Sequence, residues 1–201
     1  MTIALNKTTL KQQRDQAKTF KQFLPSLDLK RQQLLIALKA ARKRLGELDA
    51  EMNDLSVRLE PLYPLLGSST IPTLKISGLI AVRGVRIESE NVVGTHLPVV
   101  REVDFGVNDY STMATPFWLD HLVQSLQQMS RLRIEHQVAV RRFELLELAA
   151  RRITQRVNLF EKVLIPQAEQ NIRRIVIFLS DQERAAVVRS KISKGKQASD
   201  S

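Results

Sequence analysis

The sequence predicts a mainly α-helical protein: a long antiparallel two-helix coiled coil with a small β-hairpin-containing insert at the far end. Two observations predict this fold. Apolar residues recur at helical spacing before residue 67 and again after residue 114, whereas the stretch between is rich in β-branched residues and glycine. In addition, 7 glycines, 7 prolines and 5% aromatic residues among 201 are typical of long uninterrupted helices.

We assign residues 1–66 to the N-terminal coiled-coil helix. Its apolar residues alternate steps of three and four, as in a heptad seam. The seam positions are Leu10, Gln13, Ala17, Phe20, Leu24, Leu27, Arg31, Leu34, Leu38, Ala41, Leu45, Leu48, Met52, Leu55, Leu59, Leu62 and Leu66. Only Gln13 and Arg31 are polar. At 1.5 Å per residue the helix would span roughly 90 Å. Pro25 lies inside the pattern and is expected to kink the helix or to split off its first turns.

Residues 67–114 form the insert. Prolines and the Gly67-Ser68-Ser69 stretch end the first helix. Short β-branched runs follow, separated by glycines, and they predict one small β-hairpin with irregular flanks. The polar stretch Glu88–Asn91 places the expected turn near Ser89–Asn91.

Residues 115–193 form the second coiled-coil helix. Thr115 is expected to cap it, and Pro116 suits the first helical position. Its seam consists of Leu119, Leu122, Leu126, Met129, Leu146, Ala150, Ile153, Val157, Phe160, Leu164, Ala168, Ile172, Ile175 and Leu179. Successive four-residue steps from Phe160 to Ile172 predict a locally unwound supercoil around Pro166. We expect the polar, basic tail, residues 194–201, to be disordered.

Several kinds of chemistry are not indicated. There is no cysteine, which excludes disulfides and thiolate sites, and no phosphate-binding glycine loop. His96, His121 and His136 stand singly, so we predict no catalytic, cofactor-binding or metal-binding residues. No apolar run approaches the roughly 18 residues of a membrane-spanning helix, and the first ten residues lack the apolar core of a signal peptide.

The formal net charge of +10 indicates an anionic partner, which leaves nucleic acid, anionic lipid and an acidic protein surface open. Basic residues gather near both ends of the chain, which an antiparallel hairpin would bring to one tip. This predicted basic tip comprises Lys7, Lys11, Arg14, Arg184, Arg189 and Lys191. It would be a solvated helix end, a contact with an acidic or polar socket, or a nucleic-acid contact without stacking aromatics.

One stretch carries a more specific signal. Residues 151–166 resemble the C-terminal helix of the D subunit of V-type and A-type ATPases. The residues that match are Arg152, Arg156, Val157, Asn158, Glu161, Ile165 and Pro166. Asp181–Arg184, Arg189–Lys191 and Leu27–Leu34 are similar to further segments of that family, whereas Phe20–Pro25 departs from its pattern. In the insert, Gly84–Ile87 and Asn91–Gly94 match loosely.

The resemblance implies a non-catalytic central rotor shaft. The paired ends would stand inside the hexamer of catalytic A and B subunits. The insert end would bind the F subunit and the funnel-shaped C/d-type subunit on the membrane ring, with contacts expected at Gly84, Arg86, Asn91 and Gly94. ATP and Mg²⁺ would bind between A and B, and the chain would bind no cofactor or nucleic acid. It would be cytoplasmic and peripheral to the membrane. A nucleic-acid-binding helical hairpin and a generic scaffold coil remain the alternatives.

Overall fold

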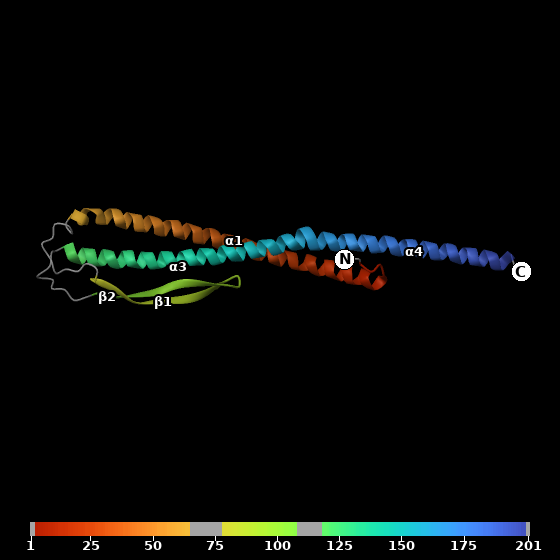
Figure 1. The fold of residues 1–201 in the computed structure, drawn as a ribbon, viewed down its shortest axis with the longest axis horizontal. Coiled ribbons are helices and arrows are strands. Elements are labelled where there is room, and N and C mark those ends of the chain that lie inside the picture. The colour runs from red at the N-terminus through yellow and green to blue at the C-terminus, as the bar shows by residue number, and fades with distance from the viewer. Residues whose placement is uncertain (1–2, 65–77, 108–117, 200–201) are drawn as a thin grey trace. The chain divides into compact units, whose positions relative to one another are not determined.

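The computed structural model describes residues 3–64, 78–107 and 118–199 (Figure 1). In chain order the elements are helix α1 (Lys7–Leu59), a 3₁₀ turn (Glu60–Leu62), strands β1 (Ile80–Val92) and β2 (Thr95–Val107), helix α3 (Trp118–Leu159), a π-helical segment (Phe160–Leu164) and helix α4 (Ile165–Ser199). Along the chain, long helices thus precede and follow a two-stranded antiparallel hairpin, which confirms the predicted fold class. The chain forms two compact units: unit 1 is residues 1–31 with 152–201, and unit 2 is residues 32–151.

Helix α1 begins where Asn6 caps it. The backbone N–H of Thr9 donates to Asn6 Oδ1 at 2.7 Å, the usual N-cap bond. Every seam position from Leu10 to Leu62 is buried or half-buried, which confirms the heptad seam. The regular helix ends at Leu59 and continues as a 3₁₀ turn with Pro61 at its start. The expected seam position Leu66 lies outside the described residues.

Pro25 does not divide α1, because one helix runs from Lys7 to Leu59. Of the two expected outcomes, the splitting off of the first turns is therefore wrong, and a kink within a continuous helix stays a prediction. Proline removes one backbone hydrogen bond, from residue 25 to the Lys21 carbonyl. The half-buried seam residues Leu24 and Leu27 continue on both sides of it, so apolar packing holds the helix together across this defect.

In unit 1 the first part of α1 packs antiparallel against α4 and the end of α3. Contacts fall in opposite order along the two helices: Lys7 with Glu183, Gln13 with Asn171 and Phe20 with Phe160. Buried apolar side chains line the pairing: Ala17, Ile153, Val157, Ala168 and Ile175. These are the predicted seam residues.

In unit 2 the rest of α1 packs against α3 around two apolar clusters. One contains Leu48, Leu55, Leu59 and Leu132. The other joins the base of the hairpin to the start of α3 and contains Leu79, Trp118, Leu119, Leu122 and Val123. The predicted cap and first position of this helix, Thr115 and Pro116, lie outside the described residues.

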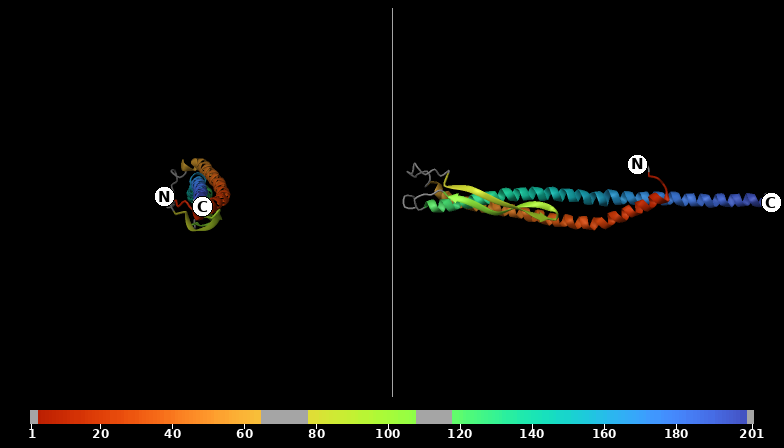
Figure 2. Two further views of the ribbon diagram at one scale, coloured as in Figure 1. Left: turned by 90° about the vertical axis from the view of Figure 1, so that its right-hand side faces the viewer. Right: turned by 90° about the horizontal axis from the view of Figure 1, so that it is seen from below.

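The hairpin is longer than expected, with 13 residues in each strand, and it lies alongside the helices of unit 2 (Figures 1 and 2). The predicted turn at Ser89–Asn91 is wrong. Val92 pairs with Thr95, so the chain turns at Val93 and Gly94, whose φ angles are 53° and 81°. Positive φ at both positions is the geometry of a tight two-residue turn, and Gly94 adopts it without steric cost. The polar residues taken for the turn are exposed strand residues instead.

The second predicted helix comprises α3, the π-helical segment and α4, which follow one another without a break. Its hydrogen-bond pattern changes from α to π at Phe160–Leu164, next to the predicted irregularity at Pro166. There the N–H of Ile165 donates to the Phe160 carbonyl, five residues back, as in a π-helix. α4 then extends to Ser199, past the expected end at residue 193. No helix in the described residues has the length and apolar content needed to cross a membrane.

Candidate interaction surfaces

The excess positive charge is confined to unit 1. Its sequence holds 17 Lys and Arg against 7 Asp and Glu, whereas unit 2 holds 14 of each, so unit 1 carries the whole net charge of +10. Charge speaks to partners and not to fold. An anionic partner would therefore favour the unit that holds both chain ends.

All six residues of the predicted basic tip are exposed, but they do not all meet. Lys7 Nζ lies 3.8 Å from Glu183 Oε1, which brings the start of α1 beside the turn that holds Arg184. α4 then continues past the start of α1 (Figure 1). Arg189 and Lys191 lie on this extension, beyond Lys7, while Lys11 and Arg14 lie further inside the pairing. The expectation of a single shared tip is corrected accordingly, because α4 is longer than the pairing.

The α4 extension, residues 181–194, is exposed at every position. It carries apolar as well as basic side chains: Val187, Val188 and Ile192 are each more than half exposed. Three exposed apolar side chains within six residues, beside Arg184, Arg189 and Lys191, make the α4 extension a candidate contact surface.

The side chains of the family-like stretch mostly face solvent. Arg152, Arg156, Glu161 and Pro166 are exposed and Asn158 is half-buried, whereas the intervening Val157 is buried in the seam. The stretch therefore combines the buried seam residues Ile153 and Val157 with charged side chains on its outward face.

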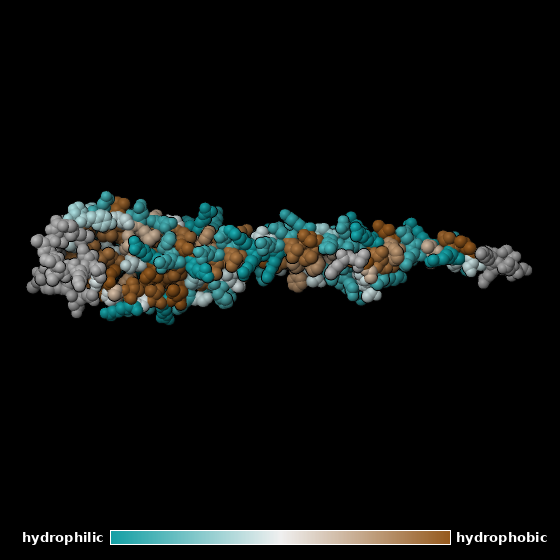
Figure 3. All heavy atoms as spheres, viewed as in Figure 1, coloured by the Kyte–Doolittle hydropathy of each residue, from teal (hydrophilic) through white to brown (hydrophobic). Residues whose placement is uncertain are grey.

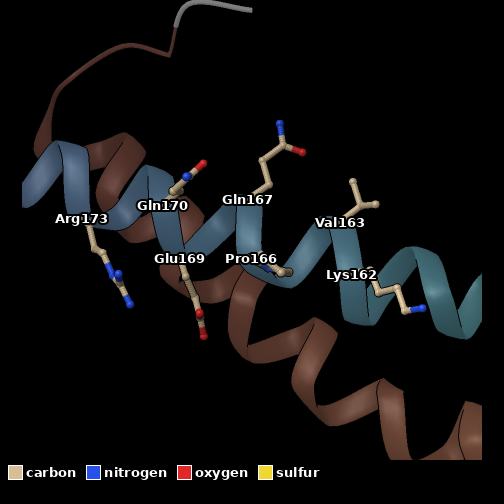
Figure 4. A pocket seen from close by; sticks show the side chains of 7 residues that line it. All are labelled: Lys162, Val163, Pro166, Gln167, Glu169, Gln170 and Arg173. Carbon is tan, nitrogen blue, oxygen red and sulfur yellow. The ribbon is translucent and has the colours of Figure 1, made fainter.

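A hollow of about 680 Å³ lies beside Pro166 (Figure 4). Its lining residues are Lys162, Val163, Pro166, Gln167, Glu169, Gln170 and Arg173. Their side chains project to different sides of the helix and do not converge on one point (Figure 4). This arrangement suits an open surface and not a site that holds a small molecule.

One lining residue forms an ion pair with α1. Glu169 Oε1 lies 2.7 Å from Lys21 Nζ. The hydrogen bond from Lys21, together with its charge, lowers the pKa of Glu169 below its ordinary value. This ion pair between α1 and α4 therefore favours the charged form of Glu169.

The predicted insert residues build the hairpin. Asn91 Oδ1 accepts the backbone N–H of Gly94 at 2.8 Å and so supports the turn. Gly84 pairs with Asp104 beside a bulge, and Arg86 Nη2 lies 3.6 Å from Glu88 Oε1. The four residues do not converge on one point.

Sequence reasoning missed an apolar face on the hairpin. The register places the pairs Ile80/Val107, Val82/Phe105, Val85/Val103 and Ile87/Val100 on one face. Val82, Val85, Ile87 and Val107 are exposed there, and Figure 3 shows an apolar area over the hairpin. Their β-branched side chains are a signal in the sequence. Two register shifts break the simple alternation that would have revealed a shared face.

An alanine groove of about 340 Å³ lies between α1 and α3 in unit 2. Its lining residues are Ala37, Ala40, Ala41, Arg44, Ala139 and Arg142. Arg142 Nη2 also lies 2.7 Å from Glu90 Oε2, so the groove and the turn end of the hairpin adjoin. On α1 nearby, Ile36 is 71% exposed. Small side chains permit close approach of another element, which makes this groove a second candidate contact surface.

Arg44 ties the two helices of unit 2 together beside the groove. Its guanidinium contacts Glu51 at 3.0 Å and Glu135 of α3 at 3.4 Å. Desolvation alone would lower the pKa of Arg44, but hydrogen bonds and attraction from Glu51, Glu47 and Glu135 raise it above its ordinary value. The network is structural, because it joins charges already fixed by the helix pairing.

The predicted single histidines do not assemble into a site. His96 and His121 are exposed, and His136 Nε2 lies 3.1 Å from Asp49 Oδ1 on the facing helix. Within residues 3–64, 78–107 and 118–199, no three or more His, Cys, Asp or Glu residues are placed to hold a metal ion.

Comparison with known proteins agrees with the resemblance. The family model for the D subunit of ATP synthase matches residues 9–195. The V-type ATP synthase D subunit of Borreliella burgdorferi is 34% identical over 192 residues, covering 96% of this chain and 93% of the relative. Those of Chlamydia trachomatis serovar L2 and Chlamydia muridarum are 31% and 30% identical, each covering 96% of this chain and 95% of the relative. The chain belongs to the family of ATP synthase D subunits.

Proposed function

We propose that this chain is the non-catalytic central shaft of a rotary V/A-type ATPase. It would transmit torque between ATP hydrolysis or synthesis in the A/B hexamer and ion translocation in the membrane ring. The observation that carries the proposal is the buried seam of the long paired helices in each unit, whose outward faces are mainly charged and polar with scattered apolar side chains. A stiff helix pair with a mainly polar outer face can turn inside a socket without adhering to it strongly.

The α4 extension and the basic residues beside it are proposed to stand inside the A/B hexamer. Two features support this placement: unit 1 carries all the excess positive charge, and the α4 extension is exposed throughout. Contacts that differ among the three catalytic sites would bias them toward different conformations, as coupling by differential binding requires. ATP and Mg²⁺ would bind between A and B, and this chain would hold no cofactor.

The hairpin face and the alanine groove are the surfaces we propose for the other stalk partners, the F subunit and the funnel-shaped C/d-type subunit. Both lie in unit 2, whose charges balance, so apolar contact and not net charge would drive binding. As part of such a complex the chain would be cytoplasmic and peripheral to the membrane.

Reconstitution tests the shaft role. The chain with F should co-elute with the cognate A and B subunits and change their ATP turnover. Separate elution with unchanged turnover would contradict the proposal. Salt-sensitive retention of RNA, with no effect on A and B, would instead support a nucleic-acid-binding hairpin, because phosphate contacts give steep salt slopes.

Matched variants test the basic surface. Arg184→Gln, Arg189→Gln and Lys191→Gln together should weaken seating in the hexamer, as should truncation from Arg184 onward. The control is the triple variant Arg133→Gln, Arg141→Gln and Arg151→Gln, which removes three exposed cations of α3. Equal affinity for both triple variants at low and high salt would place the contact elsewhere.

Two further variants separate the unit 2 surfaces. Val82→Thr, Val85→Thr and Ile87→Thr make the hairpin face polar while keeping strand-forming side chains. Ala40→Arg blocks the alanine groove. Loss of F co-elution in one variant alone would identify its surface, and the variant Glu102→Thr, on the opposite face of the hairpin, is the control.

A further inference from the structure

Both helices of unit 1 have an irregular backbone where they meet. In α1, Pro25 has no N–H to donate to the Lys21 carbonyl, four residues back. In the second helix the π-helical segment occupies Phe160–Leu164, and Pro166 likewise cannot donate to the Lys162 carbonyl. Sharp bends in helices arise mainly at prolines and π-bulges, and here each helix has such a feature.

Side-chain contacts show that the two irregular segments adjoin. The rings of Phe20 and Phe160 pack edge to face with their centroids 5.4 Å apart. The Lys21–Pro25 stretch begins one residue after Phe20, and the π-helical segment begins at Phe160 itself. Because the helices run antiparallel, the two stretches extend in opposite directions from this contact, about 7 Å along α1 and about 6 Å along the second helix at 1.5 Å per residue. The irregular backbone of the two helices therefore lies on opposite sides of one contact, within about three helical turns.

The missing bonds occur at residues that solvent can reach. Lys21, Pro25, Lys162 and Pro166 are all exposed. Water can then hydrogen-bond the Lys21 and Lys162 carbonyls when the helix opens toward solvent, so opening leaves no buried acceptor unsatisfied. In a regular helix the same movement would stretch a backbone hydrogen bond.

Nearby contacts hold the pair together without depending on straight helices. The Lys21–Glu169 ion pair joins two flexible side chains across the irregular stretch at 2.7 Å. The buried residues Ala17, Val157 and Ala168 keep the small-residue packing on both sides of it. The pair can thus change curvature at this place and remain paired.

We propose that Pro25 and the π-helical segment Phe160–Leu164 together form a flexible joint, at which this helix pair bends more easily than the regular helix of α3 does. The proposal concerns the mechanics of the chain, and it stands whether or not the shaft role is correct. If that role is correct, the joint gives the shaft a compliant point inside unit 1.

Spin-label distances on the full chain test the joint, and the absence of native cysteine allows clean labelling. One label pair, Arg152→Cys with Arg174→Cys, flanks the π-helical segment. The control pair, Arg133→Cys with Gln155→Cys, has the same sequence separation and lies wholly within α3. All four positions are exposed. We expect a broader distance distribution for the first pair.

Point variants then test whether the irregular backbone causes the broad distance distribution. Pro25→Ala and Pro166→Ala each restore one N–H, so each should narrow the first distribution, and the double variant should bring it close to the control. Gln22→Ala and Gln167→Ala remove exposed side chains nearby without changing backbone donors, and they should leave it broad. Equal widths for both pairs in the unmodified chain would overturn the proposal, as would proline variants that leave the first width unchanged.

Discussion

Asn171 of α4 donates a side-chain hydrogen bond to Gln13 of α1, with 3.1 Å between Nδ2 and Oε1. Gln13 is one of the two polar positions in the otherwise apolar seam, and both partners are half-buried. A polar pair inside a coiled coil pairs correctly only at one relative position of the helices, so it selects the register at some cost in stability.

The Gln13–Asn171 pair predicts separate effects on stability and register. Gln13→Leu should cost about 1 kcal/mol, because it leaves the Asn171 amide half-buried without this acceptor. Gln13→Leu with Asn171→Leu should recover that loss but allow slipped registers. Thermal unfolding measures the first effect. The distance between spin labels at Lys7→Cys and Glu183→Cys, whose native side chains form an ion pair, measures the second. An unchanged distance distribution in the double leucine variant would show that other contacts fix the register.

The seam could be predicted from sequence because the helical period leaves little choice of buried face. Positions such as Leu34 and Leu146 follow from spacing alone and are buried. Local backbone geometry could not be predicted in the same way. Pro25 does not divide α1, since packing on both sides outweighs one lost hydrogen bond.

The surfaces were harder to predict than the helices. The hairpin turn was misplaced because polar residues mark exposed strands as well as turns, and only the positive φ of Val93 and Gly94 distinguishes the two cases. The alanine groove depends on which faces of α1 and α3 oppose each other, and a seam pattern does not give that register. The residues of the predicted basic tip are exposed, but they do not share one tip because α4 extends past the start of α1, a difference in length that residue spacing does not give.

Truncation of Leu48 should lower the stability of unit 2 strongly. Its side chain is 1% exposed and packs in the cluster with Leu55 and Leu132. Leu48→Ala should lower the free energy of unfolding by about 2–5 kcal/mol, because it removes buried methyl groups and leaves a cavity. Ile36→Ala, at a position that is 71% exposed, should change it by about 0.5 kcal/mol or less. Urea titrations compare the two variants, and equal losses would mean that the cluster does not stabilise the helix pair.

The Lys21–Glu169 pair predicts a pH dependence for unit 1. In the folded chain, the hydrogen bond from Lys21 and the positive charge of Lys21 lower the pKa of Glu169 below its ordinary value of 4.5. Its contribution to stability is therefore present above pH 4.5 and is lost as pH falls through the lowered folded pKa. Glu169→Gln should reduce the stability loss between pH 5 and pH 3, measured by urea unfolding of both proteins at each pH. The pair is exposed, so the effect should be small and should shrink in high salt. An identical pH profile for both proteins would exclude any contribution from the pair.

The turn at Val93 and Gly94 offers a stabilising substitution. Val93 has φ of 53°, a left-handed conformation that is costly for a β-branched residue. Val93→Asn gives the Asn-Gly pair that this turn geometry favours, and it should stabilise the hairpin by about 1 kcal/mol. Gly94→Ala, at φ of 81°, should destabilise it by a similar amount although its side chain would meet no neighbour within 4 Å. Exchange rates of the amide protons that pair β1 with β2 measure both effects locally. Faster exchange in Val93→Asn would mean that the valine side chain stabilises the turn in a way its backbone angle does not predict.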